Sequence, residues 1–109
     1  MKNTKEISVA KDFSETPAGR YYTDGPYSGQ RFREEILFPA LTNYDYVIVD
    51  LDGTLGYGSS FLEETFGGLI REHKCSLDEL NKKLKINSSR RLYYERAHIY
   101  MQDAENESK

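Results

Sequence analysis

The chain has 109 residues, enough for one domain, with 38% apolar and 30% charged side chains and a formal net charge of −3. This acidic balance, with basic and acidic residues intermixed, argues against a nucleic-acid partner, because binding to phosphates needs a basic patch. The chain has one cysteine, no signal-peptide core at its amino terminus and no apolar run that could cross a bilayer, so we expect a cytoplasmic protein without disulfides, membrane segments, metal or other cofactor.

The first part of the chain predicts a β-hairpin followed by a helix. Residues 5–10 alternate between apolar and polar side chains and indicate a strand. A second short strand is expected at residues 20–23, within a segment rich in proline and glycine. From Ser28 an apolar face recurs at helical spacing as far as Leu41, and Pro39 is expected to kink or end this helix.

The middle of the chain predicts a buried strand and then an amphipathic helix. Residues 45–51 contain the β-branched run VIV, which is typical of a central strand covered on both faces. An apolar stripe predicts a helix over residues 60–73. Gly67 and Gly68 lower the helix propensity of that segment by about 1 kcal/mol each. A close approach of another group to the helix backbone would offset this cost.

The last part of the chain predicts two helices with a strand between them. Ser76 and Glu79 form the pattern of a capping box at the start of a short helix. Residues 84–87 are expected to form a strand, and residues 89–102 an amphipathic helix. The inward-facing positions of this last helix are predicted to be Leu92, Ala97, Tyr100 and Met101. The acidic residues 103–109 are expected to be a disordered tail.

This order of elements predicts the fold class. Strands alternate with helices, which is typical of an α/β domain with helices packed on a mostly parallel sheet. We therefore expect a single small α/β sandwich over residues 1–102, with the hairpin at its amino-terminal side.

The central strand ends in a motif that resembles the catalytic segment of haloacid dehalogenase-type phosphatases. In that DxDGT pattern Asp50 would attack phosphorus, Asp52 would protonate the leaving group, and Thr54 would close the motif, with magnesium screening the charge. The acidic pair that completes the metal site in such enzymes is not found after a later strand. The alternative interpretation is a strand that ends in a polar turn.

A pair of serines follows the motif and opens the second helix. Ser60 and Glu63 have the spacing of a capping box, so the Ser60 hydroxyl is expected to accept a hydrogen bond from the backbone. Ser59 would then keep a free hydroxyl. A phosphoryl group on Ser59 would add about −1.5 to −2 charges near the helix start.

The stretch GSSFLEETFGG and its flanks are similar to a bacterial family of STAS-like domains of unknown function. The resemblance runs from about residue 7 to residue 100 and extends to the STAS domains of anti-sigma factor antagonists. In those antagonists a partner kinase phosphorylates the first serine of the pair, which by position is Ser59. Two positions depart from the antagonist pattern, since Gly58 replaces an acidic residue and Phe61 replaces a glycine.

The resemblance implies a non-enzymatic regulatory module that binds another protein, with an ATP-binding kinase of the anti-sigma type as the expected partner. Phosphorylation is expected at Ser59 or Ser60. The predicted contact residues are Gly56, Tyr57, Gly58, Ser59, Phe61 and Glu64. Two alternatives remain open at this point: a magnesium-dependent phosphatase that uses Asp50 and Asp52, and an accessory subunit in which the serines only cap the helix.

Overall fold

A computed structural model describes residues 3–108 and shows a three-stranded parallel sheet with helices on it, which confirms the predicted fold class. The strands are β1 (Thr4–Ser8), β2 (Tyr46–Asp50) and β3 (Leu84–Asn87), in the order β1-β2-β3. Both neighbouring pairs are parallel, and the crossover that parallel pairing requires runs through helices in each case. The third strand has the bounds that the sequence predicts.

The predicted hairpin is wrong. β1 pairs in parallel with β2, which places Ile7 beside Val49 in the core. The expected second strand is instead a loop followed by the 3₁₀ turn η1 (Tyr22–Asp24). The Asp24 carboxylate accepts the backbone N–H groups of Arg20 and Tyr21, so the chain turns there and cannot extend. A short helix, α1 (Val9–Asp12), follows β1 directly.

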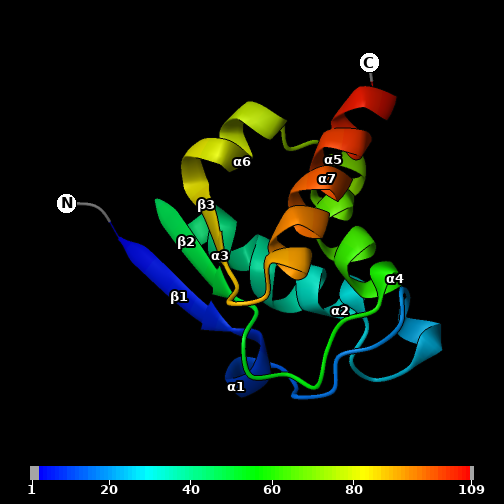
Figure 1. The fold of residues 1–109 in the computed structure, drawn as a ribbon. Helices are drawn as coiled ribbons and strands as arrows, with labels where there is room; N and C mark the ends of the chain where they lie inside the picture. The colour runs from blue at the N-terminus through cyan, green and yellow to red at the C-terminus, as the bar shows by residue number, and fades with distance from the viewer. Residues whose placement is uncertain (1–2, 109) are drawn as a thin grey trace.

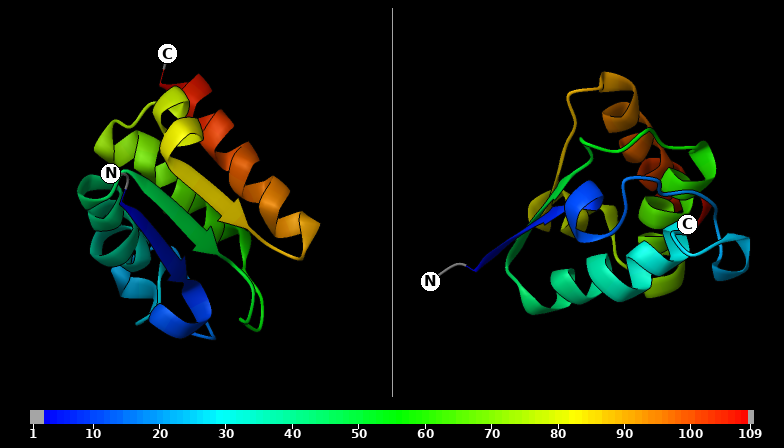
Figure 2. Two further views of the ribbon diagram at one scale, coloured as in Figure 1. Left: turned by 90° about the vertical axis from the view of Figure 1, so that its left-hand side faces the viewer. Right: turned by 90° about the horizontal axis from the view of Figure 1, so that it is seen from below.

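The helices pack against one face of the sheet (Figure 1). In the left view of Figure 2 the strands lie in front and the helices behind them. Glu6, Ile48 and Lys85 form a row across the opposite face, where Glu6 and Lys85 are exposed and Ile48 is half-buried. The prediction that the central strand is covered on both faces is therefore wrong: alternate residues Val47 and Val49 point into the core.

The first long helix is continuous from α2 (Gly29–Phe32) through the π-helical turn η2 (Arg33–Leu37) to α3 (Phe38–Asn43). Ser28 caps it by accepting the N–H of Arg31. Pro39 does not end this helix. The preceding turn is already widened, with the N–H of Phe38 donating to the carbonyl of Arg33, so the proline ring meets less crowding than in a regular α-helix.

The second long helix has the same design, and it confirms the helix predicted over residues 60–73. It runs through α4 (Ser59–Leu62), the π-helical turn η3 (Glu63–Gly67) and α5 (Gly68–His73). The predicted close approach at the glycines is also found. A Cβ atom added to Gly68 would overlap the guanidinium of Arg33, which lies on the helix backbone.

The capping box at Ser76 is confirmed and starts α6 (Leu77–Lys83). The last helix, α7 (Arg91–Glu107), is longer than predicted. Residues 103–107 belong to it, so a disordered tail over that stretch is wrong. Ala104 is buried on the same stripe as Ala97 and Met101. Packing of Ala104 against the body of the domain extends the helix beyond the point where its sequence becomes acidic.

Candidate functional site

The loop that follows β2 is held at several points by backbone hydrogen bonds. Leu51 donates to the carbonyl of Asn87 at 2.8 Å, which ties the end of β2 to β3. Leu55 donates to the carbonyl of Glu15 at 2.8 Å, while its side chain is 84% exposed. Gly53, at φ 96°, supplies the left-handed turn between these two anchors. The loop therefore reaches the second long helix along a fixed path.

Tyr57 fixes the end of this loop. Its hydroxyl donates to the carbonyl of Leu51 at 2.7 Å, and its ring meets the ring of Tyr93 edge-on at 5.0 Å. Burial raises the pKa of Tyr57, and the charges of Asp50 and Asp52 add to this effect, so the hydroxyl stays protonated and keeps donating. This contact sets the position from which the helix starts.

The two serines lie at the start of this helix, and both are exposed. The helix begins at Ser59 with Gly58 as its N-cap, one residue earlier than predicted. The expected capping box between Ser60 and Glu63 is therefore wrong. The Glu63 carboxylate instead pairs with two arginines, and within residues 3–108 neither serine hydroxyl makes a hydrogen bond.

Two of the six predicted contact residues are inside the protein. Phe61 is 1% exposed and packs near the rings of Phe32 and Tyr57. Glu64 is 4% exposed and pairs with Arg33. Neither can touch a partner without a rearrangement of the fold. The predicted contact surface is reduced to Gly56, Tyr57, Gly58 and Ser59, with Ser60 beside them.

The π turns η2 and η3 meet at a buried ion pair that the sequence analysis did not identify. Arg33 is 2% exposed, and its Nη1 donates to both the carboxylate and the carbonyl of Glu64 at 2.6 Å. Its Nε donates to Glu34 at 2.8 Å. The Gly67-Gly68 pair was the available signal, because Gly68 leaves the room that this guanidinium occupies.

A more exposed set of charges covers this pair. Glu63 accepts from Arg20 and Arg71 at 2.5 Å each, which fastens the loop before η1 to the second long helix. Burial alone would raise the pKa of Glu63, but the hydrogen bonds from Arg71 and Arg20 outweigh it and hold that pKa below its ordinary value. The arrangement is a closed set of paired charges, typical of a structural role.

The residues of the phosphatase motif lie at the carboxyl end of β2 and in the turn after it. Asp50 accepts the backbone N–H of Asp52 at 3.0 Å. Asp52 accepts both the N–H and the hydroxyl of Ser89, at 2.8 and 2.9 Å, and so fixes the turn before α7. Thr54 is half-buried in the turn. Within residues 3–108, no group of three or more His, Cys, Asp or Glu side chains is placed to hold a metal ion.

A shallow hollow of about 320 Å³ lies between the start of α4 and α7, and we refer to it as the α4–α7 hollow. Its lining residues are Tyr57, Ser59, Leu62, Leu92, Tyr93, Arg96 and Tyr100. Leu92 was predicted to face inward but is 56% exposed, because α7 turns its first apolar residue toward this hollow and away from the core. The hollow joins the serine pair to a surface that the sequence analysis did not associate with it.

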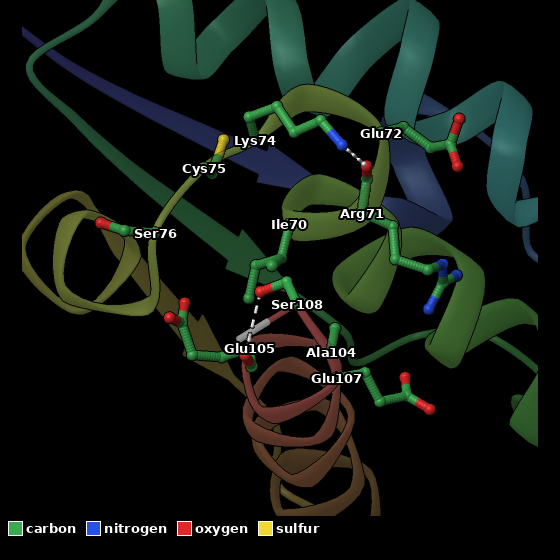
Figure 3. A pocket seen from close by; sticks show the side chains of 10 residues that line it. All are labelled: Ile70, Arg71, Glu72, Lys74, Cys75, Ser76, Ala104, Glu105, Glu107 and Ser108. Carbon is green, nitrogen blue, oxygen red and sulfur yellow. Dashed lines mark hydrogen bonds between the residues drawn. The ribbon is translucent and has the colours of Figure 1, made fainter.

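A larger hollow, of about 620 Å³, lies at the carboxyl end of α7, away from Ser59 and Ser60 (Figure 3). Both acidic and basic side chains line it. Several polar groups there bond within the protein: Lys74 donates to the carbonyl of Arg71, and Ser108 to that of Glu105. Glu105 also accepts the N–H of Leu77. The last of these contacts ties α7 to α6.

One of three comparisons with known proteins places the chain in a family. A family model described as a STAS-like domain of unknown function (DUF4325) matches residues 28–90, more than half of the chain. The chain belongs to this family. Searches of curated proteins and of solved structures found no match. The matched part of this STAS-like domain includes both long helices, their π turns and the serine pair. Within residues 3–108, no helix has the length and apolar character of a membrane-spanning segment.

Proposed function

We propose that this STAS-like domain is a regulatory module that binds another protein through the surface around Gly56–Ser60. The observation that supports this most directly is the placement of the serine pair. Ser59 and Ser60 are exposed at the start of a helix that is otherwise packed into the core, and the loop before them is held by Tyr57. Exposed hydroxyls on a firmly packed helix suit a surface whose charge is changed by phosphorylation.

The proposed switch is phosphorylation of Ser59 by a partner kinase. The γ-phosphoryl group of ATP would move to the Ser59 Oγ, as the bond from phosphorus to ADP breaks and the hydroxyl proton is released. The modified serine would add about −1.5 to −2 charges to the surface. The adjoining α4–α7 hollow has no acidic side chain in its lining. A partner that docks on that surface in the unmodified state would then be repelled or displaced.

The phosphatase alternative has less support. Asp52 would have to protonate a leaving group, yet its Oδ1 accepts two hydrogen bonds from Ser89 that fix the turn. In the helix after the motif, Glu63 and Glu64 pair with arginines and do not point to the end of β2. A magnesium-dependent hydrolysis of p-nitrophenyl phosphate that is lost in Asp50→Asn and kept in Ser59→Ala would establish this alternative instead.

The first test is affinity capture with tagged protein from its native host, followed by mass spectrometry of both the partners and the bait. We expect an ATP-binding protein to be recovered and part of the bait to carry phosphate on Ser59. In the Ser59→Glu variant, the affinity for the same partner should fall about tenfold. A repulsion of about 1.4 kcal/mol between the new carboxylate and the partner has that effect.

Ser59→Ala is the matched control for that experiment. It removes the hydroxyl without adding charge, so it should bind the partner as well as the unmodified protein does while accepting no phosphate. Equal capture by the wild-type, Ser59→Ala and Ser59→Glu proteins would contradict the switch and favour an accessory subunit whose serines have no regulatory role.

A further inference from the structure

The α4–α7 hollow has a single side chain that is charged at neutral pH. Of its seven lining residues, four are aromatic or contain a hydroxyl and two are leucines; the remaining one is Arg96. Leu92, Arg96 and Tyr100 are spaced four residues apart on α7, so they share one face of that helix. The positive charge of Arg96 therefore lies on the α7 side of the hollow, and Ser59 lies on the α4 side.

Arg96 is exposed, and no ion pair is found for it within the part of the chain that the structure describes. Its neighbours on α7 differ in this respect. Arg91 pairs with Glu95 at 3.3 Å, and the Arg90 guanidinium lies 5.8 Å from the centre of the Tyr93 ring. Elsewhere the other arginines close to the second long helix, such as Arg71, are paired with its glutamates. Arg96 is thus available to an anion in the hollow.

Ser59 forms part of the same lining, whereas Ser60 does not. A phosphoserine at position 59 would bring three acceptor oxygens and about −1.5 to −2 charges to the hollow. A guanidinium binds such a group through two parallel N–H donors, which makes arginine a stronger phosphate ligand than a single surface charge suggests. Three tyrosine rings form part of the same lining.

We propose that Arg96 binds a phosphoryl group carried by Ser59, across the α4–α7 hollow. This inference rests on the proposed function and names the residue that responds to the modification. The unmodified hollow carries the single positive charge of Arg96. The phosphorylated hollow carries a net charge of about −0.5 to −1, so the modification reverses the sign of the surface as well as filling it.

The test uses the full chain with phosphoserine installed during translation at position 59 or, as the matched control, at position 60. The second pKa of each phosphoserine is measured by ³¹P NMR at low ionic strength. A neighbouring cation favours the dianion, so the pKa of phosphoserine 59 should lie about half a unit below that of phosphoserine 60. The difference should shrink in 1 M salt, where the Debye length is about 3 Å.

Arginine variants assign the effect to a residue. Arg96→Ala should raise the pKa of phosphoserine 59 to that of phosphoserine 60, Arg96→Lys should retain part of the difference, and Arg91→Ala should leave it unchanged. Both arginines are exposed, so the variants should fold, which thermal melting would verify. Equal pKa values at the two positions, or a difference that survives Arg96→Ala, would overturn the proposal.

This experiment needs neither the kinase nor the partner. A failure here would leave the serine switch intact but without Arg96 as its phosphate ligand. If affinity capture recovers no partner but the titration shows the expected pKa difference, the phosphate site at Arg96 is supported and the proposal of a protein partner is contradicted. The two results therefore test separate statements.

Discussion

At the scale of single residues, the buried pair of Arg33 and Glu64 holds the two long helices together. Both side chains are almost fully buried, and one guanidinium nitrogen serves a carboxylate and a backbone carbonyl at once. The same carbonyl also accepts the N–H of Gly68, so the guanidinium is its second donor. Arg33 therefore also binds the backbone of the helix that carries the serines.

Removal of one partner should be costly. Arg33→Met leaves the buried Glu64 with only its longer contacts to Arg20, at 3.1 Å, and Arg71, at 3.4 Å. We therefore expect the free energy of unfolding to fall by about 3 kcal/mol in urea titrations, the lower end of the cost of breaking a buried pair. The double variant Arg33→Met with Glu64→Leu removes both charges and should recover much of that loss. If the single variant is as stable as the wild-type protein, the pair contributes nothing to holding the helices together.

At the scale of elements, Gly67 and Gly68 have different neighbours although they are adjacent in η3 and α5. A methyl group on Gly68 would overlap the buried guanidinium of Arg33, which has no room to move. A methyl group on Gly67 would meet the outer ends of Glu63 and Arg71, which are partly exposed and can shift. One glycine accommodates the ion pair, and the other faces flexible side chains.

This difference predicts opposite effects of two similar substitutions. Alanine favours a helix over glycine by about 1 kcal/mol, but overpacking costs about 1–3 kcal/mol and also displaces the buried ion pair. Gly68→Ala should therefore lower the melting temperature clearly, while Gly67→Ala should change it little. Thermal melting followed by circular dichroism measures both. A Gly68→Ala protein at least as stable as Gly67→Ala would mean that Arg33 is not held against the helix.

Local signals in the sequence were sufficient for several elements. β3 and the Ser76 cap were predicted because alternation and a capping box act over a few neighbouring residues. The prediction of a hairpin was wrong because β1 pairs with β2, a strand about 40 residues away, and no local pattern encodes which strand β1 pairs with. The predicted end of the last helix was wrong for a similar reason, since the helical state of residues 103–107 depends on the packing of Ala104.

For the candidate site, too, local signals predicted the position of the serines but not which neighbouring side chains are buried. The sequence predicted the serine pair at the start of a helix, one residue from the observed start, because glycines and serines before an apolar stripe mark that point. It could not exclude Phe61 and Glu64 from the surface, since their burial depends on Phe32 and Arg33 in another helix. The part played by α7 was also missed. Arg96 reaches the hollow only because α7 packs beside the second long helix.

At the scale of the whole molecule, ion pairs fasten the loop before η1 and both long helices to one another. Glu63 joins Arg20 to Arg71, and Glu34 accepts from Arg33 and lies 2.6 Å from the Nε2 of His73. Burial would raise the pKa of Glu34 as it would that of Glu63. In each case hydrogen bonds from the paired cations prevail, and the pKa is lowered from its ordinary value of 4.5.

The direction of these shifts predicts the response of the fold to acid. A carboxylate whose pKa is lower in the folded state contributes its full stabilisation above its unfolded pKa, near 4.5, and loses it as the pH falls through the folded value. The free energy of unfolding should therefore be nearly constant from pH 7 to 5 and then fall steeply. Urea titrations at pH 7, 5, 4 and 3 measure this. Glu63→Gln cannot be protonated, so it should be less stable than the wild-type protein at pH 7 and lose less stability between pH 4.5 and 3. Parallel pH profiles for the two proteins would show that Glu63 is not linked to folding, and the fastening of the loop to the helices would then depend on packing alone.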